Sequence, residues 1–99
     1  MAGKRIIWSS RASSELKSIL SYYNERNQST IFSSKILDSV QETIELIAVN
    51  NYLGRLTSNK RTRVINLDVF LLFYEVSTNS IDILSFWDNR QNPKERITQ

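Results

Sequence analysis

Apolar residues recur along this chain at spacings that divide it into strands and helices. Residues 5–9 form a short run rich in β-branched and aromatic side chains, as expected of a strand. Residues 11–25 and 30–49 carry apolar positions every three or four residues, which predicts two helices. Ser9 and Ser10 precede the first of these helices and Ser29 precedes the second, where a serine side chain can accept from free backbone N–H groups.

The two predicted helices should form an antiparallel hairpin. Neither Pro nor Gly interrupts them, and the link between them is short. Their apolar stripes need a cover, which a sheet would supply. The stripe residues are Ala12, Leu16, Ile19, Leu20, Tyr23, Phe32, Ile36, Val40, Ile44 and Ile47.

The second half of the chain has the pattern of a loop followed by three strands. Residues 50–60 are expected to form the loop, in which Gly54 would supply a backbone angle that other residues avoid. Strands are predicted at 61–67, 70–77 and 81–87. Two residues separate the first two of these strands, which is the length of a tight hairpin turn.

Strand faces follow from the alternation of side chains. Residues 70–73 are apolar on both faces, which predicts a central strand. In the last strand, alternation predicts that Ile81, Ile83, Ser85 and Trp87 share one face, opposite Asp82, Leu84, Phe86 and Asp88. The predicted fold class is α+β, in the order β-α-α-β-β-β, with a helical hairpin packed on a small antiparallel sheet. Residues 1–99 are expected to form a single domain.

Composition narrows the chemistry that this chain can perform. It has no Cys and no His, so it lacks thiolate and imidazole groups for catalysis or metal binding. Acid–base chemistry would have to use Lys, Asp, Glu or Tyr, and we expect no metal and no cofactor. No apolar run approaches the roughly 20 residues of a membrane span, and no signal peptide is evident, which predicts a cytoplasmic protein without a membrane partner.

Positive charge is concentrated in one interval of the sequence. No acidic residue occurs between Glu45 and Asp68, whereas that interval contains Arg55, Lys60, Arg61 and Arg63. Such a basic stripe suits an anion-binding surface, with Arg61 and Arg63 on one face of a strand. The alternative is a solvated basic edge that protects the strand from aggregation.

The end of the last strand is a second candidate site. The sequence SFWDNRQNP passes from apolar residues into amides around one arginine. If the chain stays extended there, Asp88 and Arg90 point the same way, and the carboxylate can hold the guanidinium in place. The alternative is a polar turn ended by Pro93.

Four aromatic residues are candidates for packing or partner contact. Trp8 and Trp87 lie in apolar strands, where rings usually serve the core or a partner interface. Tyr22 and Tyr23 are adjacent on a helix, so both cannot face the core, and one is expected at the surface.

The ordered set IIWSSRASSELKSILSYY, Gly54-Arg55, RVINLDVFLLFYEV and IDILSFWDNRQNP resembles the RelE/ParE superfamily of toxins from type II toxin–antitoxin modules. The resemblance covers nearly the whole chain. It implies a growth-inhibiting toxin neutralised by a cognate antitoxin, either as a homodimer or as a hetero-oligomer with that antitoxin. Members commonly carry arginines at the positions of Arg63 and Arg90, which the resemblance marks as catalytic or target-contacting. We expect Lys60, Arg61 and Asp88 to accompany them as target- or phosphate-binding residues.

The superfamily has two kinds of target. RelE-like members are ribosome-dependent endoribonucleases that cleave mRNA, whereas ParE-like members inhibit DNA gyrase and are not enzymes. The nuclease branch often carries a Tyr or His near the C-terminus, which this chain lacks after Arg90, and the long uninterrupted hairpin is more similar to the ParE side. An alternative from another class is a non-catalytic, degenerate toxin-like module that only binds its partner.

Overall fold

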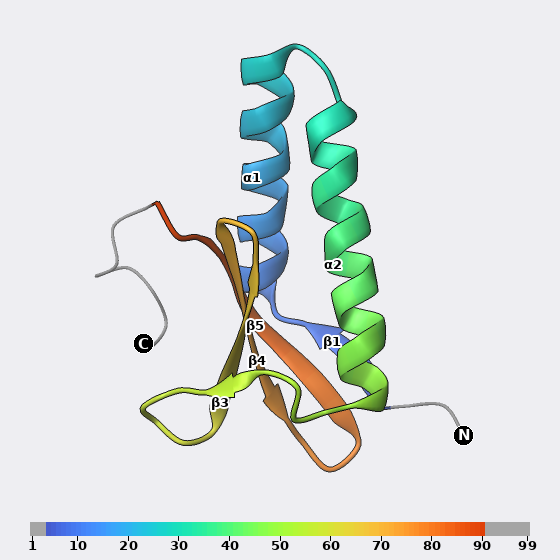
Figure 1. Cartoon of the computed structure of the whole chain (residues 1–99), viewed down its shortest axis with the longest axis vertical. Coiled ribbons are helices and arrows are strands. Elements are labelled where there is room, and N and C mark those ends of the chain that lie inside the picture. Colours follow the sequence, from blue (N-terminus) through green and yellow to red (C-terminus); the bar gives the residue numbers. More distant parts are fainter. Residues whose placement is uncertain (1–3, 91–99) are drawn as a thin grey trace.

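The computed structural model of the chain describes residues 4–90. A helical hairpin stands beside one sheet, and its tip projects well beyond the strands (Figure 1). No helix within residues 4–90 is both long and apolar enough to cross a membrane. The elements are β1 (Arg5–Trp8), α1 (Ser10–Asn27), α2 (Ile31–Val49), β2 (Arg55–Leu56), β3 (Thr62–Leu67), β4 (Phe70–Val76) and β5 (Ser80–Asp88).

The α+β class and the helical hairpin are confirmed, and the sheet contains more than the sequence predicts. Its five strands lie in the order β1-β5-β4-β3-β2, with β4 in the centre as predicted from its two apolar faces. Strands β2 to β5 pair antiparallel, but β1 pairs with β5 in parallel, with Ile6 opposite Ile81. The strand β2 lies inside the predicted 50–60 loop, because two residues are too few to produce a visible alternation.

The predicted apolar stripes of both helices face the sheet. Ile36, Val40, Ile44 and Ile47 of α2 are all buried, and Ala12, Ile19 and Tyr23 are the buried residues of α1. Ser9 caps α1 as predicted, since its Oγ accepts from the Ala12 N–H at 3.0 Å. The same hydroxyl donates to the Leu84 carbonyl at 3.1 Å, which joins the start of α1 to β5.

A β-bulge changes the faces of β5. Phe73 lies opposite Ser85, but Tyr74 lies opposite Ile83, so Leu84 is an extra residue between two paired positions. Ile81, Ile83 and Phe86 therefore all join the core under the helices, whereas Trp87 packs with Val64, Leu71 and Phe73. The prediction that Ile83 and Trp87 share a face is wrong, because one inserted residue inverts the alternation that follows it.

Helix α1 closes the edge of β5 beyond the end of β1. β1 pairs with β5 only as far as Ile83, so the next backbone groups of β5 lack a strand neighbour on that side. Glu15 of α1 supplies the acceptor: its Oε1 accepts from the Ser85 hydroxyl at 2.7 Å and from the Phe86 N–H at 3.1 Å. A side chain thus replaces a strand at the bulge, as buried backbone N–H groups require.

Gly54 is needed for space and not for an unusual backbone angle. None of the described glycines has positive φ, so the predicted reason for Gly54 is wrong. Its N–H donates to the Tyr74 hydroxyl at 2.8 Å, and that hydroxyl donates to the Asn51 carbonyl at 2.9 Å. A Cβ at this position would lie 2.8 Å from Tyr74 Cε1, so the loop can approach the ring only without one.

Candidate functional site

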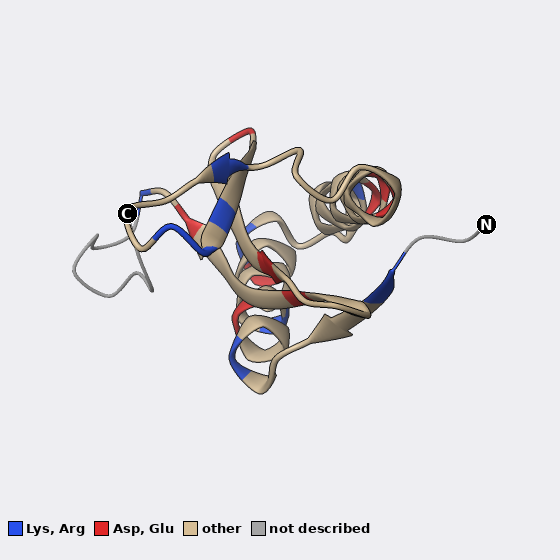
Figure 2. Cartoon of the chain, turned by 90° about the horizontal axis from the view of Figure 1, so that it is seen from below, with Lys and Arg blue, Asp and Glu red and all other residues tan. Residues whose placement is uncertain are grey.

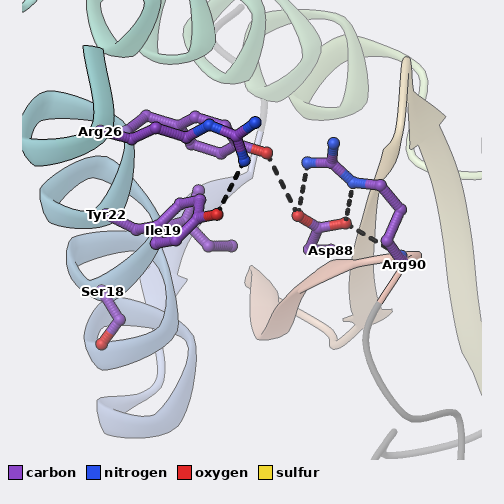
Figure 3. Close-up of a pocket in the computed structure, with 7 residues that line it drawn as sticks. Ser18, Ile19, Tyr22, Arg26, Asp88 and Arg90 are labelled. Atoms are coloured by element: carbon purple, nitrogen blue, oxygen red, sulfur yellow. Dashed lines mark hydrogen bonds and ion pairs between the residues drawn. The ribbon is translucent and has the colours of Figure 1, made fainter.

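A pocket of about 420 Å³ lies between α1 and the end of β5 (Figure 3). Two segments far apart in the sequence form it, because the C-terminal end of β5 lies beside the second half of α1. The Asn89 N–H donates to the Val69 carbonyl at 2.8 Å and anchors the chain as it leaves the strand. The lining residues are Ser18, Ile19, Tyr22, Tyr23, Arg26, Asp88 and Arg90.

One face of α1 supplies the first wall of the pocket. Ser18, Tyr22 and Arg26 are spaced by four residues, which places them on adjacent turns of the same helix face. Arg26 Nη1 donates to the Tyr22 hydroxyl at 2.9 Å. Tyr23 is buried whereas Tyr22 is 53% exposed, so the prediction that one of the two lies at the surface is confirmed.

The second wall is an ion pair between Arg90 and Asp88. Arg90 Nε and Nη2 donate to the two carboxylate oxygens at 2.9 and 2.7 Å, and the Arg90 backbone N–H donates to Oδ1 at 2.9 Å. The predicted contact is confirmed, although it forms through a turn at residues 89–90 and not through extended chain. The Arg90 guanidinium also lies 5.7 Å from the centre of the Tyr23 ring, in cation–π range.

The pocket carries a net positive charge beside aromatic surface. Among the described residues that line it are two guanidinium groups and one carboxylate. The Asp88 side chain is only 13% exposed, whereas the Arg90 side chain is 56% exposed, so the cation faces outward. Two of the five guanidinium N–H groups of Arg90 are directed at Asp88, which leaves the others for an incoming anion.

The other predicted arginine lies elsewhere in the sheet. Arg63 is opposite Tyr74 on β3, whereas Asp88 is opposite Phe70 at the other end of β4. Four residues of strand separate these levels by about 13 Å, and Arg90 lies further out still. Arg63 and Arg90 therefore do not share one anion site.

Arg63 is held by the loop that precedes β2. Its Nη1 donates to the Gly54 carbonyl at 2.8 Å, and its guanidinium lies 5.0 Å from the centre of the Tyr52 ring. Lys60 and Arg61 are exposed on the turn between β2 and β3, outside the strand that was predicted to begin at residue 61. Asn59 fixes this turn, because its Oδ1 accepts from the N–H groups of Arg61 and Thr62, both at 2.8 Å.

Tyr74 is the buried titratable group beside Arg63. Burial raises the pKa of its hydroxyl, outweighing the opposite effects of the Gly54 hydrogen bond and the Arg63 charge. The phenol is therefore neutral at physiological pH and serves as a hydrogen-bond bridge between the loop and β4. Within residues 4–90, no cluster of acidic side chains could hold a metal ion.

The sequence by itself does not reveal the α1 side of the pocket. The four-residue spacing of Ser18, Tyr22 and Arg26 was available as a signal, but it is also typical of a solvated helix face. Their relation to Asp88 and Arg90 depends on packing between segments about 65 residues apart. Gln91, Asn92 and Pro93, which complete the predicted C-terminal motif, lie outside the described residues.

Comparison with known families shows which protein family this chain belongs to. A sequence profile described as the ParE toxin of type II toxin–antitoxin systems, parDE, matches residues 6–93. The chain belongs to the ParE toxin family. The match runs from β1 past the end of β5, so both walls of the pocket lie inside the ParE region.

The fold agrees with that of a solved toxin–antitoxin structure. A chain from the chromosomal ParDE TA system from P. aeruginosa superposes with a TM-score of 0.60 at 23% sequence identity. The superposition covers 84% of this ParE-family chain and 92% of the other chain. At this identity the likeness shows the fold. A comparison with curated proteins finds no matching sequence.

Proposed function

We propose that this protein inhibits growth by binding DNA gyrase in the cytoplasm, and that a cognate antitoxin neutralises it. Membership of the ParE family supports the toxin role and the antitoxin partner. The resemblance of this chain to ParE-like gyrase inhibitors supports DNA gyrase as the target. We infer that Arg90 contacts gyrase. The observation behind this inference is the two-pronged ion pair in which Asp88 holds Arg90 at the edge of the pocket.

The pocket is better suited to binding an anion than to cleaving RNA. Among its described lining residues, the carboxylate belongs to Asp88, which is already paired with Arg90. A general base must be able to reach and accept a proton, and a carboxylate in such a pair is poorly placed for this. Arg90 and Arg26 can instead receive a carboxylate or phosphate of the target, with the tyrosine rings as apolar walls.

The test compares the two targets directly. The purified protein should inhibit DNA supercoiling by gyrase and leave ribosome-bound mRNA intact. Arg90→Gln and Arg26→Gln should each weaken gyrase inhibition by about tenfold or more, as expected on loss of a charged contact. Lys17→Gln is the matched control, because Lys17 is an exposed cation on α1 that does not line the pocket.

Two other results would indicate a nuclease or a non-catalytic binding module. Cleavage of ribosome-bound mRNA without an effect on gyrase would replace the proposal with a RelE-like nuclease. Unimpaired growth at good expression, together with intact partner binding, would identify a degenerate binding module.

A further inference from the structure

Exposed apolar side chains cluster in one short stretch of the chain, far from the Arg90 end of the sheet. Leu46 and Val49 lie on the face of α2 that points away from the core, since their neighbours Ile44 and Ile47 are buried. Three more follow in the loop and in β2. We call the five together the apolar strip; they are Leu46, Val49, Tyr52, Leu53 and Leu56, with exposures of 57, 74, 65, 45 and 43%.

The apolar strip adjoins an open edge of the sheet. β2 is the last strand in the sheet order and pairs only with β3. The Thr57 N–H donates to the Thr62 carbonyl at 2.8 Å, so by alternation the backbone N–H and C=O of Leu56 point to the open side. Open edges with nearby apolar side chains are where an added segment can pair and pack.

A basic border lies beside the β2 end of the apolar strip. Leu56 lies opposite Arg63, whose guanidinium covers the Tyr52 ring, so the cation and the apolar side chains form one surface. Arg55, Lys60 and Arg61 are exposed close by, and no acidic residue occurs from 46 to 67. Figure 2 shows several blue segments on the side of the sheet away from the N-terminus, and further blue segments beside the N-terminus and on the helices.

We propose that the apolar strip and its basic border are the docking site for an acidic segment of the antitoxin that carries spaced apolar side chains. This inference rests on the proposed function for the identity of the partner. Apolar side chains of the segment would cover the strip, and its carboxylates would pair with Arg55, Arg61 and Arg63. Large exposed apolar patches with polar rims mark interaction sites in soluble proteins.

Two other occupants fit the surface less well. A second copy of this chain related by two-fold symmetry would place the same basic border against itself, and like charges repel. Nucleic-acid interfaces are more polar and much more basic than a surface with four exposed Leu and Val side chains. The charge and the apolar area together favour an acidic protein segment.

The experiment measures binding of the full chain to the protein encoded by the adjacent reading frame, and to short synthetic peptides that tile that protein's sequence. Val49→Asp and Leu53→Asp should each raise the Kd by about tenfold or more, because they place a carboxylate in the apolar contact. Arg55→Glu and Arg61→Glu should weaken binding and reduce its dependence on salt. Leu37→Asp is the matched control, since Leu37 is 45% exposed on α2 and lies outside the strip.

Every result bears on the site. Equal affinities for the wild type and for both strip variants and both border variants would overturn the docking site and leave the toxin proposal standing. Self-association abolished by Leu53→Asp, or nucleic-acid binding abolished by Arg61→Glu, would replace the antitoxin segment with that occupant. Growth inhibition and gyrase inhibition by Val49→Asp and Leu53→Asp should match the wild type. A failure of the proposed function would therefore show in those two assays and not in the binding assay.

Discussion

Arg90 donates to both carboxylate oxygens of Asp88, through Nε at 2.9 Å and Nη2 at 2.7 Å. The pair fixes the plane of an exposed guanidinium beside the Tyr23 ring. That ring packs edge-on against the Phe32 ring, with the ring centres 4.7 Å apart. A flexible surface arginine would lose side-chain entropy on binding a target, whereas one already held in place loses less. We therefore propose that this geometry prepares Arg90 to bind an anion.

The Arg90 pair predicts unequal effects of two conservative changes. Arg90→Lys should lower toxicity about tenfold or more, because an ammonium group cannot reproduce the two-pronged contact. Asp88→Asn should have a smaller effect of the same sign, since the amide can still accept one hydrogen bond. Growth inhibition at matched expression is the measurement, with circular dichroism to confirm the fold. Full toxicity of Arg90→Ala would contradict the assignment of this site.

Arg63 and Arg90 should separate two functions. The sequence predicts that both arginines serve toxicity, but the structure places them at opposite ends of β4. We expect Arg63→Ala to weaken antitoxin binding more than gyrase inhibition, and Arg90→Ala to do the reverse. Both properties are measured on each purified variant. Loss of gyrase inhibition in Arg63→Ala with unchanged antitoxin affinity would return Arg63 to the target site.

Glu15 should stabilise the bulge in β5. Glu15→Gln should lower the free energy of unfolding by about 1–2 kcal/mol, because a neutral amide accepts more weakly from the Ser85 hydroxyl and the Phe86 N–H. Urea unfolding measures the change. Glu25→Gln, an exposed change on the same helix, should stay within about 0.5 kcal/mol. Equal effects of the two changes would show that Glu15 does not support the bulge.

Tyr74 should make stability fall in alkaline solution. Burial raises its pKa in the folded protein above the unfolded value of 10.0, so the unfolded chain releases this proton first as pH rises. The contribution of the protonated Tyr74 hydroxyl to the free energy of unfolding is fully present below pH 10 and is lost as pH rises through the pKa of the folded protein. Tyr74→Phe should therefore lose less stability between pH 9 and pH 11 than the wild type does.

The same change has a second effect at neutral pH. Tyr74→Phe should cost about 1–3 kcal/mol at pH 7, because it leaves the buried Gly54 N–H without its acceptor. Unfolding curves at several pH values measure both effects, with exposed Tyr52→Phe as the control. An identical alkaline loss in Tyr74→Phe and the wild type would assign that loss to other groups.

Gly54→Ala should be destabilising although Gly54 does not have positive φ. The new Cβ would lie 2.8 Å from Tyr74 Cε1, 2.9 Å from its hydroxyl oxygen and 3.2 Å from Arg63 Cβ. Moving a buried ring or the strand beside it costs about 1–3 kcal/mol. Thermal unfolding measures the loss of stability. Tyr74→Phe keeps the Cε1 atom, so Gly54→Ala should still cost most of this stability when it is made in the Tyr74→Phe protein. A stability equal to that of the wild type would show that the loop shifts without cost.

Local patterns in the sequence determined the helices, the central strand and the Arg90–Asp88 contact. Helical spacing is a property of neighbouring residues, so the stripe from Ile36 to Ile47 identified the buried face of α2 without any tertiary information. The double-sided apolar run at Phe70–Phe73 likewise identified β4 as central. Asp88 and Arg90 are two residues apart, close enough for their contact to be anticipated from the chain alone.

Tertiary structure alone decided what depends on register and on distant segments. The bulge at Leu84 inverts the faces of β5, because strand alternation carries no mark of an inserted residue. Strand register separates Arg63 from Arg90 along β4, and pairing with β3 makes a strand of Arg55 and Leu56. The pocket exists because β5 ends beside α1, where Tyr23 comes within 3.5 Å of Asp88 across about 65 residues of sequence. Such contacts are set by how whole elements pack, which local side-chain spacing does not encode.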